Sequence, residues 1–489
     1  MISFLETVLS EFRSCFSRKA AYHWFVVVIL GLLTRMDKLG VTSFIRALSI
    51  NGQYYECMLH FFRSSAYTLD GLKTKWYSIL KSSDCLLHFE GRIFLAGDGT
   101  KTAKEGKHMP GVQKLYQESE NCSKAPYIFG HMFGGLAALI GNSSAYFAAP
   151  ISMDIHLGLS SMSNWDDSLS NRSTSHVVRM IENAFEAAQH LGKAYLCLDR
   201  YFLAVPALKR LAELCGNEDL LHIITRAKMN CIAYEEPDIP SAKKRGRPRK
   251  KGETIKLAEL FESEKDKFKE TVATLYRQEE TISYLCKDLL WGNGLYKKLR
   301  FVLVRRGNTR GIFVSTDLTL DPVKIVEAYA MRFSIESTFK ELKQQIGGFS
   351  YHFWTKSLPR LNRYKKKEEP DNLSKVIAPA DRERVKQTVV ATERFVLFSC
   401  IAIGLAQMIA LDERFIKTLS SSRYLRTSAH TKQSEGTVVS YLQRNLFRLL
   451  LSNTDSDLML EPGGIDHSES SRNNQSELIR NSQCTRMAN

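Results

Sequence analysis

Four side chains suited to phosphate and metal chemistry recur at helical spacing within one segment of the chain. They are Tyr329, Arg332, Glu336 and Lys343. At about 100° per residue, these positions fall within an arc of about 60° on one helix face. A glutamate binds a hard divalent cation through oxygen, whereas arginine and lysine donate charge-assisted hydrogen bonds to phosphate. These residue types on one face could serve metal-dependent phosphate chemistry, and a solvated face with ordinary ion pairs would carry the same charges.

The segment that holds these residues has clear start and stop signals. Asp321 and Pro322 supply an N-cap and a first-turn proline, and Gly347-Gly348 supplies a stop. An apolar stripe within an arc of about 80° lies beside the polar one; it contains Met331, Ile335, Phe339, Leu342 and Ile346. We predict one continuous helix that buries the apolar stripe and presents the polar stripe.

Two aspartates upstream each follow a short apolar run. Asp98 follows IFLAG and precedes Gly99, and Asp199 follows AYLCL and precedes Arg200. Both are predicted to lie at strand ends. Aspartate beside glycine is also common turn chemistry, which is an alternative reading for Asp98. A carboxylate that closes a buried apolar strand must find a partner or a metal, and this favours a functional role for Asp199.

The pattern Y-x2-R-x3-E-x6-K resembles the YREK signature of bacterial insertion-sequence DDE transposases, the insertion-sequence type 4 family. The segments strand-Asp98-Gly-Thr and strand-Asp199-Arg-Tyr, followed by the pair Thr225-Arg226, resemble the same family in the same order. The motifs span about residues 91–353, and the resemblance is weak or absent at both ends of the chain.

The resemblance implies a DNA transposase that cleaves transposon ends and transfers them into target DNA. Asp98, Asp199 and Glu336 would bind two Mg²⁺ ions about 4 Å apart, with Mn²⁺ as a substitute. Tyr329, Arg332 and Lys343 would hold the DNA end beside the scissile phosphate, and Arg226 would also contact DNA. The expected partners are the terminal inverted repeats, target DNA and a second copy of the chain in a homodimeric synaptic complex.

The elements around the two aspartates have a familiar order. Three strands are predicted at Ile93–Ala96, Tyr127–Ile140 and Ala145–Ile151. A helix from about Val177 to Leu191, a strand at Ala194–Leu198, a helix around Val205–Leu214 and a strand at Leu221–Thr225 follow. Periodicity alone indicates α/β or α+β. The β-β-β-α-β-α-β order resembles the ribonuclease-H-like fold.

We predict a ribonuclease-H-like catalytic domain interrupted by a mostly β insertion and flanked by helical regions. Residues 1–88 would form a helical N-terminal domain that binds DNA ends, and residues 89–227 the first part of the catalytic domain. Residues 228–320 would form the insertion with its basic linker, and residues 321–355 the second catalytic part. Residues 356–452 would form a helical C-terminal region suited to dimerisation. Residues 453–489, rich in Ser, Asn and acids, are predicted to be a disordered tail.

Composition favours a polyanionic partner. Lys and Arg outnumber Asp and Glu by 68 to 52, a formal net charge of +16. The apolar run Trp24–Leu33 is too short to span a bilayer, which needs about 20 residues. The ten cysteines are scattered without metal-binding spacing, as expected for free thiols in a reducing compartment. We expect a cytoplasmic, nucleoid-associated bacterial protein with no membrane contact.

Two further segments carry weaker signals for DNA contact. The stretch KKRGRPRKKG resembles an AT-hook, in which Arg245 and Arg247 would enter a narrow minor groove. A solvated basic linker is the alternative. Trp291 in LLWGNG could stack on a flipped base or simply pack in the insertion.

Two other functions remain open from the sequence. One is a DNA-binding protein that keeps the fold without the reaction, with its basic linker as the main contact. The other is a Mg²⁺-dependent nuclease that cleaves without strand transfer. Both would share much of the same charge pattern.

Overall fold

One large sheet connects the middle of the chain to the β-rich region that follows it. The computed structural model describes residues 1–117, 125–165, 173, 175–237, 249–364, 371–423 and 433–451. Its strands are β1 (His88–Phe89), β2 (Arg92–Ala103), β3 (Gln113–Tyr116), β4 (Tyr127–Gly141), β5 (Tyr146–Ile155), β6 (Ala194–Leu198), β7 (Leu221–Ala227), β8 (Ile232–Tyr234), β9 (Thr254–Lys256), β10 (Lys269–Leu275), β11 (Gln278–Trp291), β12 (Lys297–Arg306) and β13 (Thr309–Ser315). The main path of the mixed sheet runs β3-β4-β2-β6-β7-β13-β12-β11-β8-β9.

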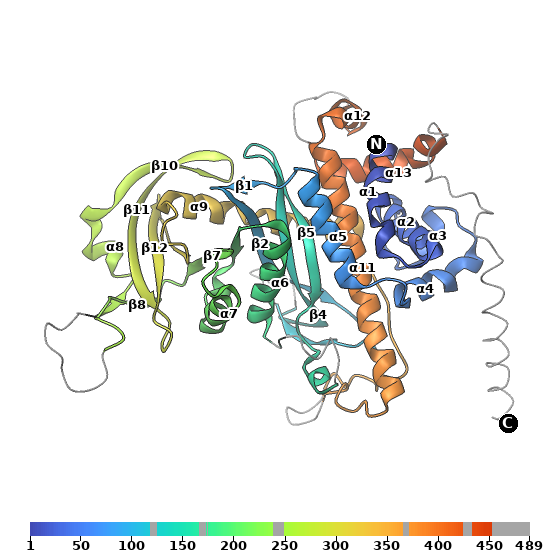
Figure 1. Ribbon diagram of the computed structural model, residues 1–489, viewed down its shortest axis with the longest axis horizontal. Helices are drawn as coiled ribbons and strands as arrows, with labels where there is room; N and C mark the ends of the chain where they lie inside the picture. Colours follow the sequence, from blue (N-terminus) through green and yellow to red (C-terminus); the bar gives the residue numbers. More distant parts are fainter. Residues whose placement is uncertain are drawn as a thin grey trace.

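Helices cover the central part of the sheet and build the opposite end of the molecule from the β-rich region (Figure 1). They are α1 (Ile2–Glu11), α2 (Lys19–Thr34), α3 (Thr42–Ala47), α4 (Tyr55–Arg63), α5 (Leu69–Ser82), α6 (His176–Leu191), α7 (Val205–Cys215), α8 (Leu260–Ser263), α9 (Pro322–Met331), α10 (Ser334–Glu341), α11 (Pro379–Leu411), α12 (Glu413–Arg423) and α13 (Glu435–Leu451). Short 3-10 turns include η2 (Gly52–Tyr54) and η4 (Arg200–Phe202), and a π turn, η6 (Leu342–Ile346), follows α10.

The predicted order of the central region is confirmed. Antiparallel β2, β4 and β5 are followed by α6, β6, α7 and β7, and β6 lies parallel to both β2 and β7. Helix α6 ends before Gly192, whose φ of 127° suits glycine. Strand β3, which pairs with β4 at the edge of the sheet, was not predicted from the sequence.

The insertion is rich in strands, as predicted, but its strands do not form a sheet of their own. Strand β13 pairs antiparallel with β7, with Val314 opposite Thr225. The strands of the insertion therefore extend the central sheet, and the two regions share backbone hydrogen bonds.

The predicted continuous helix from Asp321 to Gly347 was wrong in its middle. Helix α9 ends at Met331, and α10 begins at Ser334. Across the break, the amides of Phe333 and Glu336 donate to carbonyls three residues back, which tightens the turn. Both predicted ends are confirmed: the Asp321 side chain accepts from the amides of Val323 and Lys324, and Gly347 is left-handed with a φ of 64°.

The helices of the two chain ends share one core with the sheet. Helix α11 packs against α2, α4, α13 and strand β5, and one cluster of buried apolar side chains runs through all of them. In the described part of the chain, α11 is the one helix with the length and apolar character of a membrane span. Because 94% of its apolar window is buried within the protein, α11 is placed as a core helix.

Two buried basic side chains hold the end of η6 and the chain that follows it. The Arg35 guanidinium, fully buried, donates to the carbonyls of Ile346 and Gly347 and lies 4.8 Å from the Phe44 ring. Lys104, which follows β2, donates to the carbonyls of Phe349 and Tyr351. The last carbonyls of a helix carry partial negative charge and lack partners within the helix, so Arg35 stabilises the end of the α10–η6 segment, and Lys104 fixes the chain that follows it.

Lys104 makes the stability of the fold depend on pH. Burial lowers the pKa of Lys104 to about 7 from its ordinary value of 10.5. Between these two values the unfolded chain binds a proton that the folded chain does not. The free energy of unfolding therefore rises with pH there, by up to about 1.4 kcal/mol per unit.

We expect the stability of the native chain relative to Lys104→Met to increase between about pH 7 and pH 10. Urea unfolding of both proteins across this range measures the difference. Lys107→Met, at an exposed position close by, should follow the native slope. Parallel curves for the native chain and Lys104→Met would contradict the prediction.

Candidate active site

Parallel pairing of β2 with β6 brings the two predicted aspartates together. Gly97 lies opposite Leu198, so Asp98 on β2 and Asp199, directly after β6, occupy the next positions along the two backbones. Asp199 directly follows β6, as predicted. Asp98 does not end its strand: β2 continues to Ala103, because residues 99–103 keep pairing with β4. The backbone on both sides of Asp98 is therefore held in the sheet.

The third predicted carboxylate reaches the same place from α10. Arg332, in the break between α9 and α10, donates to Asp98 Oδ2 at 3.2 Å and to Glu336 Oε1 at 2.6 Å. Its guanidinium thus bridges two carboxylates that are 238 residues apart in the sequence. The arginine is 7% exposed, whereas the Glu336 side chain is 42% exposed. A buried cation therefore joins Asp98 to Glu336, which faces solvent.

Asp199 has its own set of contacts. The Tyr329 hydroxyl donates to Asp199 Oδ1 at 3.1 Å, and the Thr225 hydroxyl donates to the Asp199 carbonyl at 2.9 Å. The Arg226 guanidinium lies 5.6 Å from the Tyr329 ring centroid and 5.5 Å from that of Phe313. Thr225 of the predicted Thr225-Arg226 pair therefore holds the Asp199 backbone, and Arg226 packs against the Tyr329 ring.

Lys343 lies in η6, beyond the end of α10 that carries Glu336. It is exposed, and its Nζ donates to the Lys101 carbonyl at 3.2 Å. Lys101 is three residues beyond Asp98 on β2. The structure thus places Tyr329, Arg332, Glu336 and Lys343 along one side of the α9–α10 segment, next to the two aspartates, despite the break.

The ionisation of Asp98 depends on burial and on the charged groups around it. Burial raises the pKa of Asp98, and the Asp199 and Glu336 carboxylates raise it further. Arg332 and the Gly99 amide, which donates to Asp98 Oδ1 at 2.7 Å, work in the opposite direction. Burial alone would lower the pKa of Arg332, but Asp98, Tyr329 and Glu336 raise it above its ordinary value. The site thus concentrates negative charge that a cation stabilises.

The donor set suits a hard divalent metal, because it offers carboxylate oxygens and no sulfur or imidazole. Among the described residues, however, no three His, Cys, Asp or Glu side chains stand together as a group that could hold an ion. The Arg332 guanidinium lies between Asp98 and Glu336 and is bonded to both. Metal binding by all three carboxylates therefore requires the arginine to leave one of them.

Close packing beneath α10 sets its height above the sheet. A Cβ atom on Gly135, opposite Asp98 on β4, would stand 2.7 Å from the Phe339 ring. On the other face, a Cβ on Gly134 would stand 2.0 Å from the His156 ring, and His156 Nδ1 lies 2.6 Å from His176 Nδ1. Glycines on β4 thus allow both layers to approach the sheet closely.

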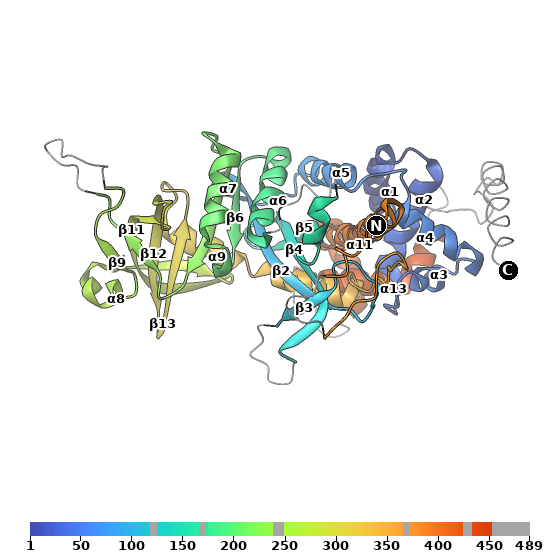
Figure 2. The same ribbon diagram turned by 90° about the horizontal axis from the view of Figure 1, so that it is seen from below.

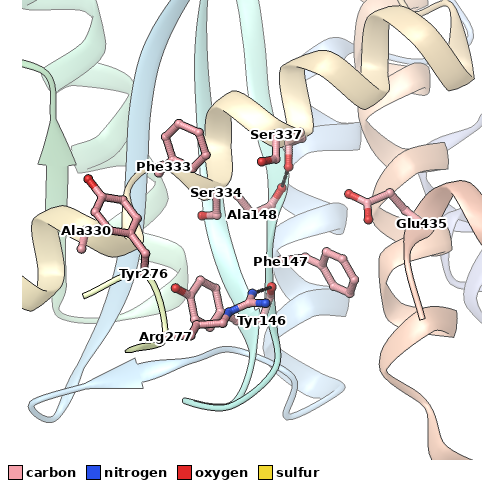
Figure 3. A pocket seen from close by; sticks show the side chains of 11 residues that line it. Tyr146, Phe147, Ala148, Tyr276, Arg277, Ala330, Phe333, Ser334, Ser337 and Glu435 are labelled. Carbon is pink, nitrogen blue, oxygen red and sulfur yellow. Dashed lines mark hydrogen bonds between the residues drawn. The ribbon is translucent and has the colours of Figure 1, made fainter. Parts of the chain in front are cut away.

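A cavity of about 300 Å³ lies beside α10. Figure 3 shows Ser334 and Ser337 of α10 facing it, with Tyr146 and Arg277 on the other side. The Arg277 guanidinium stacks 4.5 Å from the Tyr146 ring centroid. Neither Glu336 nor the two aspartates line this cavity, so it is separate from the carboxylate site.

The remaining sequence predictions have mixed outcomes. Trp291 is half-buried and packs against the apolar core, which is the packing alternative. Arg245, Arg247 and the predicted tail at 453–489 lie outside the described residues. The eight cysteines that the structure describes are free.

The sequence reasoning missed the supports of the site. Arg35 contacts carbonyls more than 300 residues away, and no local pattern could reveal that pairing. The His156–His176 pair likewise depends on the tertiary structure, because it joins the residue that follows β5 to the first residue of α6. The paired glycines at 134 and 135 were the one available signal, since adjacent glycines within a strand indicate close approach.

Comparison with known proteins gives one match. A family model described as "DDE superfamily endonuclease" matches residues 11–283, which is more than half of the chain. The matched part includes Asp98 and Asp199 and ends before Glu336. No curated protein and no solved structure matches the chain.

The contact between Gly135 and Phe339 predicts the effect of one added methyl group. Gly135→Ala should push Phe339 and α10 away from the sheet and lower the free energy of unfolding by about 1–3 kcal/mol, measured by urea denaturation. Gly52→Ala is the control, because a Cβ at Gly52 has no neighbour within 4 Å. Phe339→Leu should restore part of the loss in the double variant. Equal stabilities of Gly135→Ala and Gly52→Ala would show that the contact does not position the helix.

Proposed function

Since this chain belongs to the DDE superfamily endonucleases, we propose that it is a DNA transposase. It would cleave phosphodiester bonds at transposon ends in a metal-dependent reaction and transfer those ends into target DNA. Members of this family are nuclease- or transposase-like enzymes that act on DNA. The arrangement of side chains around Asp98 supports the more specific proposal.

One observation carries the proposal. Asp98 on β2 and Asp199 directly after the parallel strand β6 occupy neighbouring positions, and Arg332 links Asp98 to Glu336. These residues come from three remote parts of the chain, and a carboxylate in a partly buried position destabilises a fold unless it is compensated. Apolar residues would pack the same space without the free-energy cost of burying charge, so the cluster is better explained by function than by stability.

Asp98, Asp199 and Glu336 would hold the divalent metal, which when bound would activate the attacking oxygen and stabilise the leaving oxygen. Two other side chains of the site, Arg332 and Lys343, would contact the DNA. Arg332, once released from Glu336, can donate two parallel hydrogen bonds to a phosphate. Tyr329 would keep Asp199 oriented through its hydroxyl, and Lys343, on the exposed side of the site, would contact a neighbouring phosphate.

The same proposal covers partners and surroundings. The net charge of +16 suits a polyanionic substrate. Transposon terminal inverted repeats and target DNA would be the two substrates, and two copies of the chain would hold the two ends in a synaptic complex. Residues 1–88 would contact the DNA end, and Arg226, Arg245 and Arg247 would add phosphate contacts.

Replacing each carboxylate by its amide tests the assignment. Asp98→Asn, Asp199→Asn and Glu336→Gln should each lower the rate of Mg²⁺- or Mn²⁺-dependent end cleavage by roughly 10²–10³-fold or more, because each removes charge that the transition state needs. DNA binding in a chelator should persist. Asp219→Asn is the matched control, since this carboxylate is half-exposed and pairs with Arg92 and Lys193 away from the site.

The outcomes separate the proposal from its alternatives. Full cleavage by any of the three variants refutes the carboxylate assignment. Native protein that binds element ends but never nicks them supports a DNA-binding protein without the reaction. Cleavage without transfer of a labelled end into a target plasmid supports a nuclease.

A further inference from the structure

Two half-exposed tyrosines face each other on the β3–β4 hairpin, in the same sheet as the candidate active site. Tyr116 is 54% exposed and Tyr127 is 50% exposed. They are direct cross-strand partners, and their ring centroids are 5.3 Å apart. Lys114 lies on the same surface with its Nζ 4.4 Å from the Tyr127 ring centroid. We call Lys114, Tyr116 and Tyr127 the hairpin surface.

The hairpin surface is joined to the carboxylate site by a short chain of contacts. Lys101 Nζ donates to the Tyr116 carbonyl at 2.6 Å, and the Lys101 carbonyl accepts from Lys343 Nζ at 3.2 Å. Lys101 is separated from Asp98 by three residues of extended strand, or about 10 Å. Strand β4 itself runs eight residues, or about 26 Å, from Tyr127 to Gly135, which lies opposite Asp98. Figure 2 shows β3 at the edge of the sheet beside β2 and β4.

We infer that the hairpin surface binds unpaired nucleotides of the DNA substrate, several nucleotides away from the cleavage point. The inference rests on the proposed DNA-cleaving function, which supplies the substrate. Half-exposed aromatic rings beside lysines are the chemistry of single-strand binding, because every base offers a face for stacking and every nucleotide a phosphate. Bases inside a duplex are already stacked, so a purely duplex-binding surface would need the lysines but not the rings.

Charge and placement favour this occupant. Lys114 lies beside the Tyr127 ring, and Lys101 binds the Tyr116 carbonyl. The Arg363 guanidinium lies 5.0 Å from the ring centroid of Phe129, which is opposite Lys114 on β4. These cations suit phosphates. A cross-strand tyrosine pair can also stabilise a hairpin without any ligand. The experiment must therefore separate binding from stability.

The test measures DNA binding in a chelator, where no cleavage occurs. The probes are a labelled duplex with a short single-stranded extension, 3′ or 5′ in separate samples, and the same duplex with blunt ends. Tyr116→Ala/Tyr127→Ala should weaken binding of an extended probe by about 10-fold or more, because stacking contributes about that much per base. Binding of the blunt probe should stay within the experimental error. Loss with either extension supports the inference.

Three further variants give the controls. Tyr116→Phe/Tyr127→Phe keeps the rings and should bind as the native protein does. Tyr276→Ala removes an equally exposed tyrosine, 55% exposed, from the β10–β11 turn and should have no effect. Lys114→Gln should reduce the salt dependence of binding to the extended probe by about one phosphate contact.

Equal weakening for extended and blunt probes, or no weakening at all, overturns the inference, and thermal unfolding shows whether the alanine variant is folded. If that variant is unfolded, the Lys114→Gln salt dependence decides. Absence of cleavage by the native protein in Mg²⁺ bears on the proposed function alone, because binding in a chelator is measured separately.

Discussion

Repulsion between like charges is the constraint on which this structure depends. Parallel pairing of β2 and β6 forces Asp98 and Asp199 into adjacent positions, and α10 adds Glu336. Carboxylates gathered near the protein interior need a cation close by. Arg332 supplies it, and the break in the helix at this residue allows its guanidinium to contact two carboxylates from one backbone position. The polar site and the irregular helix are thus one feature.

The position of that helix is decided far from the site. Arg35 in the N-terminal helical region binds carbonyls at the end of η6, and Lys104 after β2 binds carbonyls just beyond it. Phe339 of α10 packs directly against Gly135 of the sheet. Helix α11 completes the core against which these parts pack. Because one apolar core joins all these elements, a change in a region without site residues can still shift the carboxylates.

The surroundings of the site extend along the sheet in two directions. Strand β13 of the insertion pairs with β7, which carries Thr225 and Arg226. On the other side, β2 and β4 continue past Asp98 to the hairpin formed with β3. A rigid sheet therefore connects the carboxylates to both neighbouring surfaces, and this arrangement suits an enzyme that must hold a long polymer in a fixed register with the reacting bond.

The sequence by itself determined the order of the central strands and helices, the ends of the segment at Asp321 and Gly347, and the residue types of the site, because these follow from local periodicity, capping and turn chemistry. It placed Asp199 correctly after β6. Only the tertiary structure decided that β2 runs on past Asp98, that the helix breaks at Arg332, and that Arg35 holds its end. Each of these depends on partners remote in the chain, whose contacts outweigh weak local preferences.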